Sequence, residues 1–159
     1  MPLAGNISQQ EKCVDLINFT ISKLKGIDVL INNAGVFHFC SLQNITDQML
    51  TEIMHVSIEI LIYLTRLALN YLTNSQHGMI INISPLVDLV SLPQVSGYSA
   101  TKRVLDEFTG SMREKVGHIP VKICNISSCQ LATVLACEQK KISIILPQQT
   151  NSRNGYFVD

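Results

Sequence analysis

The sequence lacks several features that would place it in a specialised class of proteins. It has no tryptophan, aromatic residues make up only 6% of the chain, and 12 basic side chains balance 12 acidic ones. Without a net charge there is no broad electrostatic footprint, so we expect neither nucleic acid nor an anionic membrane as a partner. The N-terminus has no basic stretch followed by an apolar one. We therefore expect no secretory signal and a cytoplasmic protein.

Metal sites, disulfide frameworks and membrane spans also lack support. The cysteines are odd in number and scattered without a CxxC pair: Cys13, Cys40, Cys124, Cys129 and Cys137. This pattern predicts free thiols in a reducing compartment and no metal site. The longest apolar stretch, residues 49–72, is interrupted by four ionisable side chains: Glu52, His55, Glu59 and Arg66. Their charges argue against a membrane span.

What is present is the pattern of one globular domain, with 47% hydrophobic residues and a mean hydropathy of +0.25. Apolar residues at helical spacing predict helices over residues 9–25, 46–72 and 97–116. Short apolar runs predict strands over residues 27–31, 79–83 and 121–126, with 142–146 as a candidate fourth. This alternation predicts an α/β fold, namely a partial doubly wound (Rossmann-like) parallel sheet with helices on both faces. We expect it to span residues 1–135, followed by a divergent segment, residues 136–159.

Two local signals mark helix starts. Ser8 and Glu11 have the spacing of a capping box, in which each side chain satisfies a backbone donor of the first turn. Thr46 is the expected cap of the second helix.

Tyr98 and Lys102 are the residues with the clearest catalytic potential. They stand four apart near the start of the third predicted helix, so their side chains share one face. A tyrosine has an ordinary pKa of about 10, and a neighbouring ammonium favours its phenolate form. Such a pair can move a proton to or from a carbonyl or alcohol oxygen. Alone, this spacing is also common on ordinary solvated helices.

A second motif lies at the same edge of the predicted sheet. Asn32, Asn33, Ala34 and Gly35 follow the first strand directly, where ligands of parallel sheets bind. Together with Tyr98-Ser-Ala-Thr-Lys102 after the next strand, they make the chain resemble the short-chain dehydrogenase/reductase family. The resemblance implies hydride transfer between NAD or NADP and a small-molecule alcohol or carbonyl substrate. In that reaction the tyrosine is the general acid/base and the lysine supports it.

The resemblance also implies a set of cofactor contacts. Residues 5–8 resemble the family's Gly-Asp-Val-Thr segment beside the adenine, with Asn6 in place of the acidic residue. Asn33 and its two neighbours match the motif that approaches the ribose. The cofactor-binding residues implied in this way are Asn6, Ile7, Asn33, Ala34, Gly35, Tyr98, Lys102 and Leu131.

Departures from the family pattern affect the same site. The position of the family's catalytic serine is Pro85, which offers neither a hydroxyl nor a backbone donor. Ser84 is the candidate replacement, although on a regular strand it faces the opposite side. Ser57 stands where the family has a helical asparagine. No G-x-x-x-G-x-G motif occurs, so the phosphate-binding turn and the first strands of the fold are expected to be missing.

Three interpretations follow from this mixture. The first is an oxidoreductase of this family with an impaired site, using Tyr98, Lys102 and Ser84. The second is a non-catalytic binding or dimerising module, because the two long helices that form a homo-oligomer interface in many family members are intact. The third is a truncated product without a function of its own. Missing strands would also leave an exposed sheet edge at residues 27–31.

Overall fold

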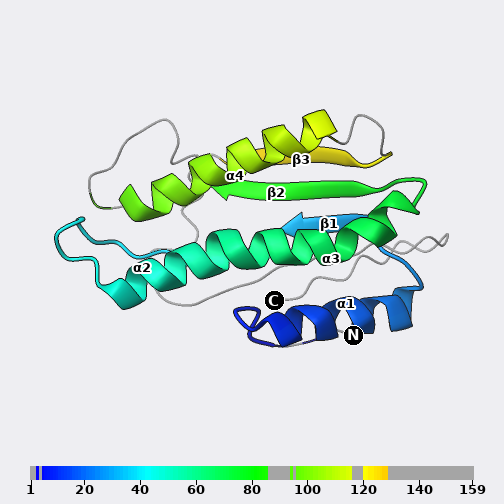
Figure 1. Ribbon diagram of the computed structural model, residues 1–159, viewed down its shortest axis with the longest axis horizontal. Coiled ribbons are helices and arrows are strands. Elements are labelled where there is room, and N and C mark those ends of the chain that lie inside the picture. Colours follow the sequence, from blue (N-terminus) through cyan, green and yellow to red (C-terminus); the bar gives the residue numbers. More distant parts are fainter. Residues whose placement is uncertain (1–2, 4, 86–93, 95, 116–119, 129–159) are drawn as a thin grey trace.

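The computed structural model describes residues 3, 5–85, 94, 96–115 and 120–128. Their centre is a three-stranded parallel sheet with strand order β1-β2-β3 (Figure 1). The strands are β1 (Val29–Asn32), β2 (Met79–Pro85) and β3 (Lys122–Ser128). Parallel neighbours need long crossover connections, and here each crossover contains a helix.

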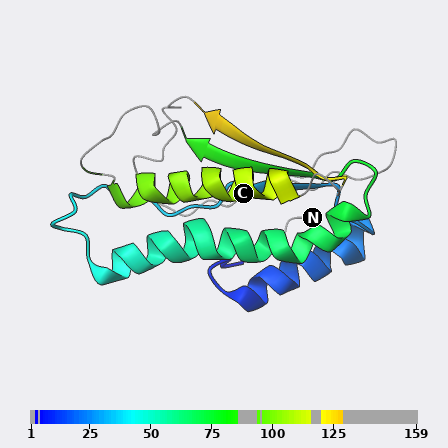
Figure 2. The ribbon, with the colours of Figure 1, turned by 45° about the horizontal axis from the view of Figure 1, so that its top comes forward.

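The helices lie in a layer against this sheet (Figure 2). They are α1 (Gln10–Leu24), α2 (Asp47–Met54), the π-helical turn η1 (His55–Ile60), α3 (Leu61–Thr73) and α4 (Ser96–Lys115). The segments α2, η1 and α3 follow one another without a break and form one long helix (Figure 1). Because both right-handed crossovers advance in the same direction across the sheet, their helices cover the same face. The described residues thus provide helices on one of the two faces that were expected to carry them.

The burial of the strands agrees with a sheet covered mainly on one side. Leu30 pairs with Ile80, and both are 1% exposed in the core beneath the helices. The next residues along the strands, Ile31 and Ile81, also pair and are only half-buried. Since successive strand residues face opposite sides, these isoleucines belong to the second face of the sheet.

The predicted elements are confirmed to within a few residues at each end. The helix expected over residues 9–25 is α1, and the strand expected over 27–31 is β1, displaced by one or two residues. The helices expected over 46–72 and 97–116 and the strands over 79–83 and 121–126 are also present. The candidate strand at 142–146 and the divergent segment 136–159 lie outside the described residues.

One helix cap follows the sequence prediction and the other does not. Thr46 Oγ1 accepts a hydrogen bond from Met49 N at 3.2 Å, as expected for the cap of α2. The capping box of Ser8 and Glu11 was a wrong prediction, because α1 begins after Gln9 without a side-chain cap. Ser8 instead donates its backbone N–H and its hydroxyl to Asn6 Oδ1, at 3.1 and 2.9 Å. Such a local turn at asparagine competes with helix capping.

The long helix departs from a uniform buried stripe at its start. Leu50, an apolar residue of the helix expected over residues 46–72, is 43% exposed. The reason is its position, because α2 projects beyond the carboxyl ends of the strands (Figure 1). Burial becomes regular from Ile53 onward, through Ile60, Leu64 and Leu72.

Candidate active site

The candidate site lies where the parallel strands end. Parallel strands bring their carboxyl ends to one edge of the sheet, and loops at that edge carry the ligand-binding residues of such folds. In this chain β1 ends at Asn32, directly before Asn33, Ala34 and Gly35. The first turn of α4, which follows β2 in the chain, carries Tyr98.

Tyr98 and Lys102 are brought together as the spacing predicts. Their exposed fractions are 7% and 5%, so α4 holds both in the interior. Lys102 Nζ lies over the Tyr98 ring, 5.1 Å from its centroid. A cation over an aromatic face is attracted by the ring quadrupole. The two side chains are therefore in direct electrostatic contact through the face of the ring.

An aromatic residue that the sequence reading missed completes this cluster. The ring of Phe37 meets Tyr98 edge-on, with centroids 5.1 Å apart and an interplanar angle of 88°. Phe37 belongs to the loop after β1, and the next residue, His38, fastens that loop to Glu52 of α2 at 3.3 Å. The loop from the first motif thus packs directly on the tyrosine of the second.

The loop after β1 is also attached to the π-helical turn. Val36 N donates to Ser57 Oγ at 3.4 Å, and Ser57 is buried. Asn33 is exposed, whereas Ala34 and Gly35 are half-buried. A π-helical turn inside a long helix is common at functional sites, and here it places a hydroxyl against this loop. The sequence singled out Ser57 by position, but nothing in it predicted the π-helical geometry.

The segment before α1 reaches the same helical turn from another side. Asn6 is exposed, while the side chain of Ile7 is 7% exposed and belongs to the hydrophobic core. Ile7 O accepts a hydrogen bond from Cys13 Sγ at 3.4 Å, and burial raises the pKa of that thiol. The carbonyl oxygen of Ser8 lies 2.7 Å from His55 Nε2. Both segments matched to cofactor binding are therefore anchored on η1.

Beneath the site, asparagines at the same register join the three strands. Asn32 pairs with Asn82, and Asn82 pairs with Asn125. Asn32 Nδ2 donates to Asn82 Oδ1 at 2.8 Å, and Asn82 Nδ2 donates to Asn125 Oδ1 at 3.2 Å. This asparagine ladder continues to the helices through Thr65 Oγ1, which accepts from Asn32, and Thr109 Oγ1, which accepts from Asn82. The signal available in the sequence was an asparagine inside the second and third predicted strands and another directly after the first.

The remaining predicted site residues are only partly described. Ser84 and Pro85 belong to β2, whose backbone pairs in register through both, with Ser127 and Ser128 of β3. The backbone pairing of β2 thus shows no interruption at Pro85. Leu131 lies outside the described residues.

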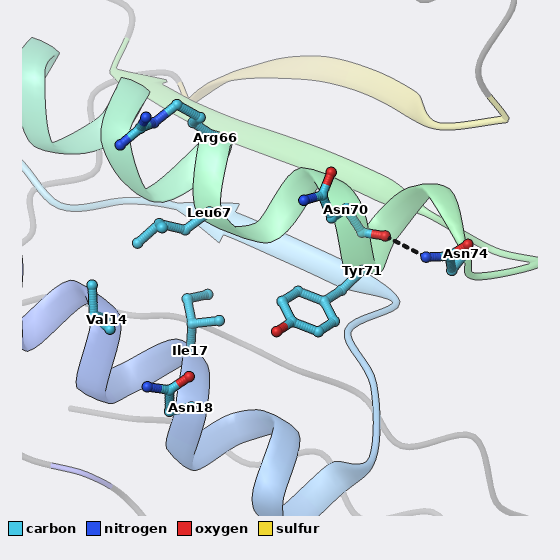
Figure 3. A pocket seen from close by; sticks show the side chains of 8 residues that line it. All are labelled: Val14, Ile17, Asn18, Arg66, Leu67, Asn70, Tyr71 and Asn74. Atoms are coloured by element: carbon cyan, nitrogen blue, oxygen red, sulfur yellow. Dashed lines mark hydrogen bonds between the residues drawn. The ribbon is translucent and has the colours of Figure 1, made fainter.

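Three further structural facts concern a groove, metal sites and membrane spans. A groove of about 520 Å³ lies between α1 and α3, away from Tyr98 and Lys102 (Figure 3). Its lining residues are Val14, Ile17, Asn18, Arg66, Leu67, Asn70, Tyr71 and Asn74. Within the described ranges, no three His, Cys, Asp or Glu side chains are grouped so as to hold a metal ion. The described helices also include none with the length and apolar character needed to cross a membrane.

The sequence of this chain is similar to a known protein family and to several characterised proteins. The family model described as short chain dehydrogenase matches residues 1–142. General stress protein 39 of Bacillus subtilis is 27% identical over 154 residues, which cover 96% of this chain and 51% of that protein. D-beta-hydroxybutyrate dehydrogenase of Cupriavidus necator is 29% identical over 105 residues, covering 66% of this chain and 41% of the relative.

A solved structure shows the same fold. The NADH-dependent reductase A1-R′, complexed with NAD, superposes with a TM-score of 0.75 at 19% identity, covering 83% of this chain and 58% of that one. The chain thus spans about half the length of the proteins that it matches.

Proposed function

The chain belongs to the short-chain dehydrogenase/reductase family, and on that premise we propose that it serves hydride transfer between NAD or NADP and a small-molecule alcohol or carbonyl compound. The observation that carries the proposal is the buried pair of Tyr98 and Lys102, with Nζ 5.1 Å from the ring centroid. Tyr98 is the general acid/base and exchanges a proton with the substrate oxygen. The ammonium of Lys102 favours the phenolate form of the tyrosine.

The residues at the edge of the sheet fit part of the cofactor. The exposed side-chain amides of Asn6 and Asn33 suit the polar edges of the adenine and the ribose. The side chain of Ile7 is buried in the core and so holds the backbone of this segment against it. Ala34, Gly35 and Leu131 complete the proposed contacts. The 159 residues contain no Gly-rich turn for the pyrophosphate. When bound, the nicotinamide would supply or accept the hydride. This chain would bind and orient the cofactor and the substrate, and Tyr98 would move the proton.

Cofactor titration followed by single substitutions tests the proposal. NADH and NADPH are titrated into the purified chain by nicotinamide fluorescence, and bound samples are then assayed with carbonyl substrates. We expect saturable binding, and we expect Tyr98→Phe to lower turnover about 10²- to 10⁴-fold with little change in cofactor affinity. Tyr71→Phe, on the exposed face of α3, is the matched control and leaves turnover unchanged. Equal turnover of Tyr98→Phe and the unaltered chain would remove Tyr98 from the reaction.

A second candidate function has an observation of its own in Pro85. Proline has no hydroxyl to take the place of the family's catalytic serine. The adjacent residue with a hydroxyl is Ser84, which directly precedes it. This favours a non-catalytic relative that binds a ligand or a partner without turnover. Saturable NAD(P) binding together with no turnover of any tested carbonyl would favour this function. A loss of turnover in Ser84→Ala would instead assign the hydroxyl role to Ser84.

A homo-oligomer through the two long helices is the proposed assembly. Apolar side chains on these helices remain substantially exposed: Leu50, Met54, Ile62 and Val104, at 43%, 44%, 37% and 42%. Burial of such side chains between copies is the usual source of stability for a helical dimer interface. Sedimentation velocity tests it: Val104→Lys should shift the chain toward monomer, and an unchanged dimer would place the interface elsewhere. The cytoplasmic location stays a prediction.

A further inference from the structure

Both ring nitrogens of His55 lie against hydrogen-bond acceptors. Nδ1 is 2.8 Å from Glu59 Oε2, one turn further along the long helix, and Nε2 is 2.7 Å from the carbonyl oxygen of Ser8. Glu59 in turn accepts from Gln10 Nε2 of α1 at 3.3 Å. These contacts link three parts of the chain, namely η1, the start of α1 and the segment that precedes it. The sequence reading assigned no role to His55.

The chemistry of imidazole makes this environment selective for one protonation state. A neutral ring carries a single N–H and can donate to only one of the two acceptors. The other nitrogen would then turn a lone pair toward a second oxygen. The imidazolium donates to both. In agreement, the hydrogen bond to Glu59 and then that to the Ser8 carbonyl raise the pKa of His55 above its ordinary 6.5. The same pairing lowers the pKa of Glu59 from 4.5.

The contact lies at a point where few other interactions hold the chain. The segment over residues 5–8 is otherwise fastened by the Ile7 side chain in the core and by the bond from Cys13 Sγ to Ile7 O. Further along the same pair of helices, side chains of α1 and α3 line the groove seen in Figure 3. The polar attachment of this part of the chain to η1 is therefore made by His55, through the Ser8 carbonyl, and by Glu59, through Gln10.

We propose that His55, as the imidazolium, is a positioning residue that holds residues 5–8 against η1 and so forms the adenine side of the cofactor site. The assignment of that side rests on the proposed function, through Asn6 and Ile7. The clamp joins this segment to the turn whose Ser57 holds the loop after β1. One protonation event thus controls the relative position of two cofactor-binding segments. Its chemical consequence is cofactor binding that weakens as His55 loses its proton.

The direction of the pH effect follows from the two shifts. The groups that face His55 are the Glu59 carboxylate of its own helix and, from the segment before α1, the neutral Ser8 carbonyl; the Gln10 amide of α1 reaches Glu59 and carries no charge. A raised folded-state pKa gives stability that is complete below about pH 6.5 and is lost as the pH rises through the folded value. The lowered pKa of Glu59 adds a lower limit, with stability lost as the pH falls below 4.5 through the folded value.

A histidine titration tests the clamp without reference to cofactor. The four histidines of the chain are followed by NMR between pH 4 and 9, and the one that disappears in His55→Gln is His55. We expect its pKa to lie above 6.5 and to fall toward 6.5 in Glu59→Gln, which keeps the shape of the side chain but removes the charge. A His55 pKa at or below 6.5, or one unchanged in Glu59→Gln, would overturn the proposal.

Amide exchange and cofactor binding then test the positioning role. At pH 6 we expect His55→Gln to exchange the amides of Ser8 and Gln9 about two- to tenfold faster than the unaltered chain, with the difference vanishing near pH 9. His77→Gln, an exposed histidine in the turn before β2, is the matched control and leaves these rates unchanged. Equal protection in His55→Gln and the unaltered chain at pH 6 would refute the clamp.

The binding readout separates this inference from the function on which it rests. For the unaltered chain and His77→Gln, the NADH dissociation constant should rise about two- to tenfold between pH 6 and pH 9. In His55→Gln it should be independent of pH and remain at the weaker value. Binding whose pH dependence is the same in His55→Gln would defeat the positioning role. Absence of NADH binding at every pH, with the raised His55 pKa and faster exchange observed, would defeat the proposed function and leave the clamp standing.

Discussion

At the scale of single residues, the centre of the sheet depends on amide side chains as much as on apolar ones. Asn82 is 1% exposed and is surrounded by partners on both neighbouring strands and on α4. A buried amide is tolerated only when its hydrogen bonds are made, because each unpaired polar group carries its full desolvation cost. The ladder therefore fixes the register of the strands whose ends carry the candidate site.

The first prediction concerns this ladder. Asn82→Ala removes the central amide and leaves donors and acceptors on Asn32, Thr109 and Asn125 with fewer partners. We expect the free energy of unfolding to fall by about 2–4 kcal/mol. Urea denaturation followed by circular dichroism measures the change. Asn44→Ala, at an exposed loop position, serves as the control and should change it by less than about 0.5 kcal/mol. Similar values for the two variants would show that the ladder contributes little.

At the scale of elements, two glycines have opposite relations to their surroundings. Gly110 lies inside α4, and a β-carbon added there would meet no atom within 4 Å. Gly78 precedes β2, and its added β-carbon would lie 2.2 Å from the backbone oxygen of Leu72. Glycine in an open helical position costs conformational entropy, whereas a glycine at such a close approach is required by the packing.

The second prediction uses this pair. Gly110→Ala should raise the free energy of unfolding by about 0.5–1 kcal/mol, because alanine restricts the unfolded chain and favours the helix. Gly78→Ala should lower it by about 2 kcal/mol or more, since the backbone of α3 must move away from β2. Thermal and urea unfolding of both variants show whether each substitution raises or lowers the free energy of unfolding. A gain in both would show that the end of α3 yields freely at Gly78.

The elements also show which features of the fold the sequence could predict. Apolar periodicity was sufficient for the six confirmed predictions, three helices and three strands, because core burial decides those patterns. It could not reveal the π-helical turn at His55–Ile60, whose extra backbone residue leaves no mark in side-chain chemistry. The capping box failed because Asn6 Oδ1, two residues before Ser8, accepts the Ser8 backbone N–H that the Glu11 side chain was expected to accept.

The candidate site was predictable in its residues and unpredictable in its contacts. Tyr98 and Lys102 share a helical face by spacing alone, so their approach follows from one helix. Phe37 reaches Tyr98 from a loop far away in the sequence, and His55 reaches Ser8 across two elements. Contacts of this kind depend on how the elements pack, and no pattern within either segment predicts them.

At the scale of the whole molecule, the two faces of the sheet differ in cover. The face toward the helices contains Leu30 and Ile80, both 1% exposed. The opposite face carries Ile31, Ile81 and Ile83, all half-buried, and Ile126, which is 46% exposed. Exposing an apolar face of this kind to water costs free energy, so parallel sheets normally have both faces covered. How completely this second face is covered in solution is therefore a question that mutation can answer.

The last prediction compares two neighbouring isoleucines of β2 on these two faces. Ile80→Ala creates a cavity under the helices and should lower the free energy of unfolding by about 3–4 kcal/mol. Ile81→Ala removes the same atoms from the half-buried face and should cost about half as much. Both variants replace isoleucine by alanine at neighbouring positions of the same strand. The difference between their free energies of unfolding therefore measures how completely each face of the sheet is covered. Equal losses would mean that the second face is closed in solution as completely as the first. If a second copy of the chain closes it, the cost of Ile81→Ala must also vary with protein concentration, whereas cover within one chain gives the same cost at every concentration.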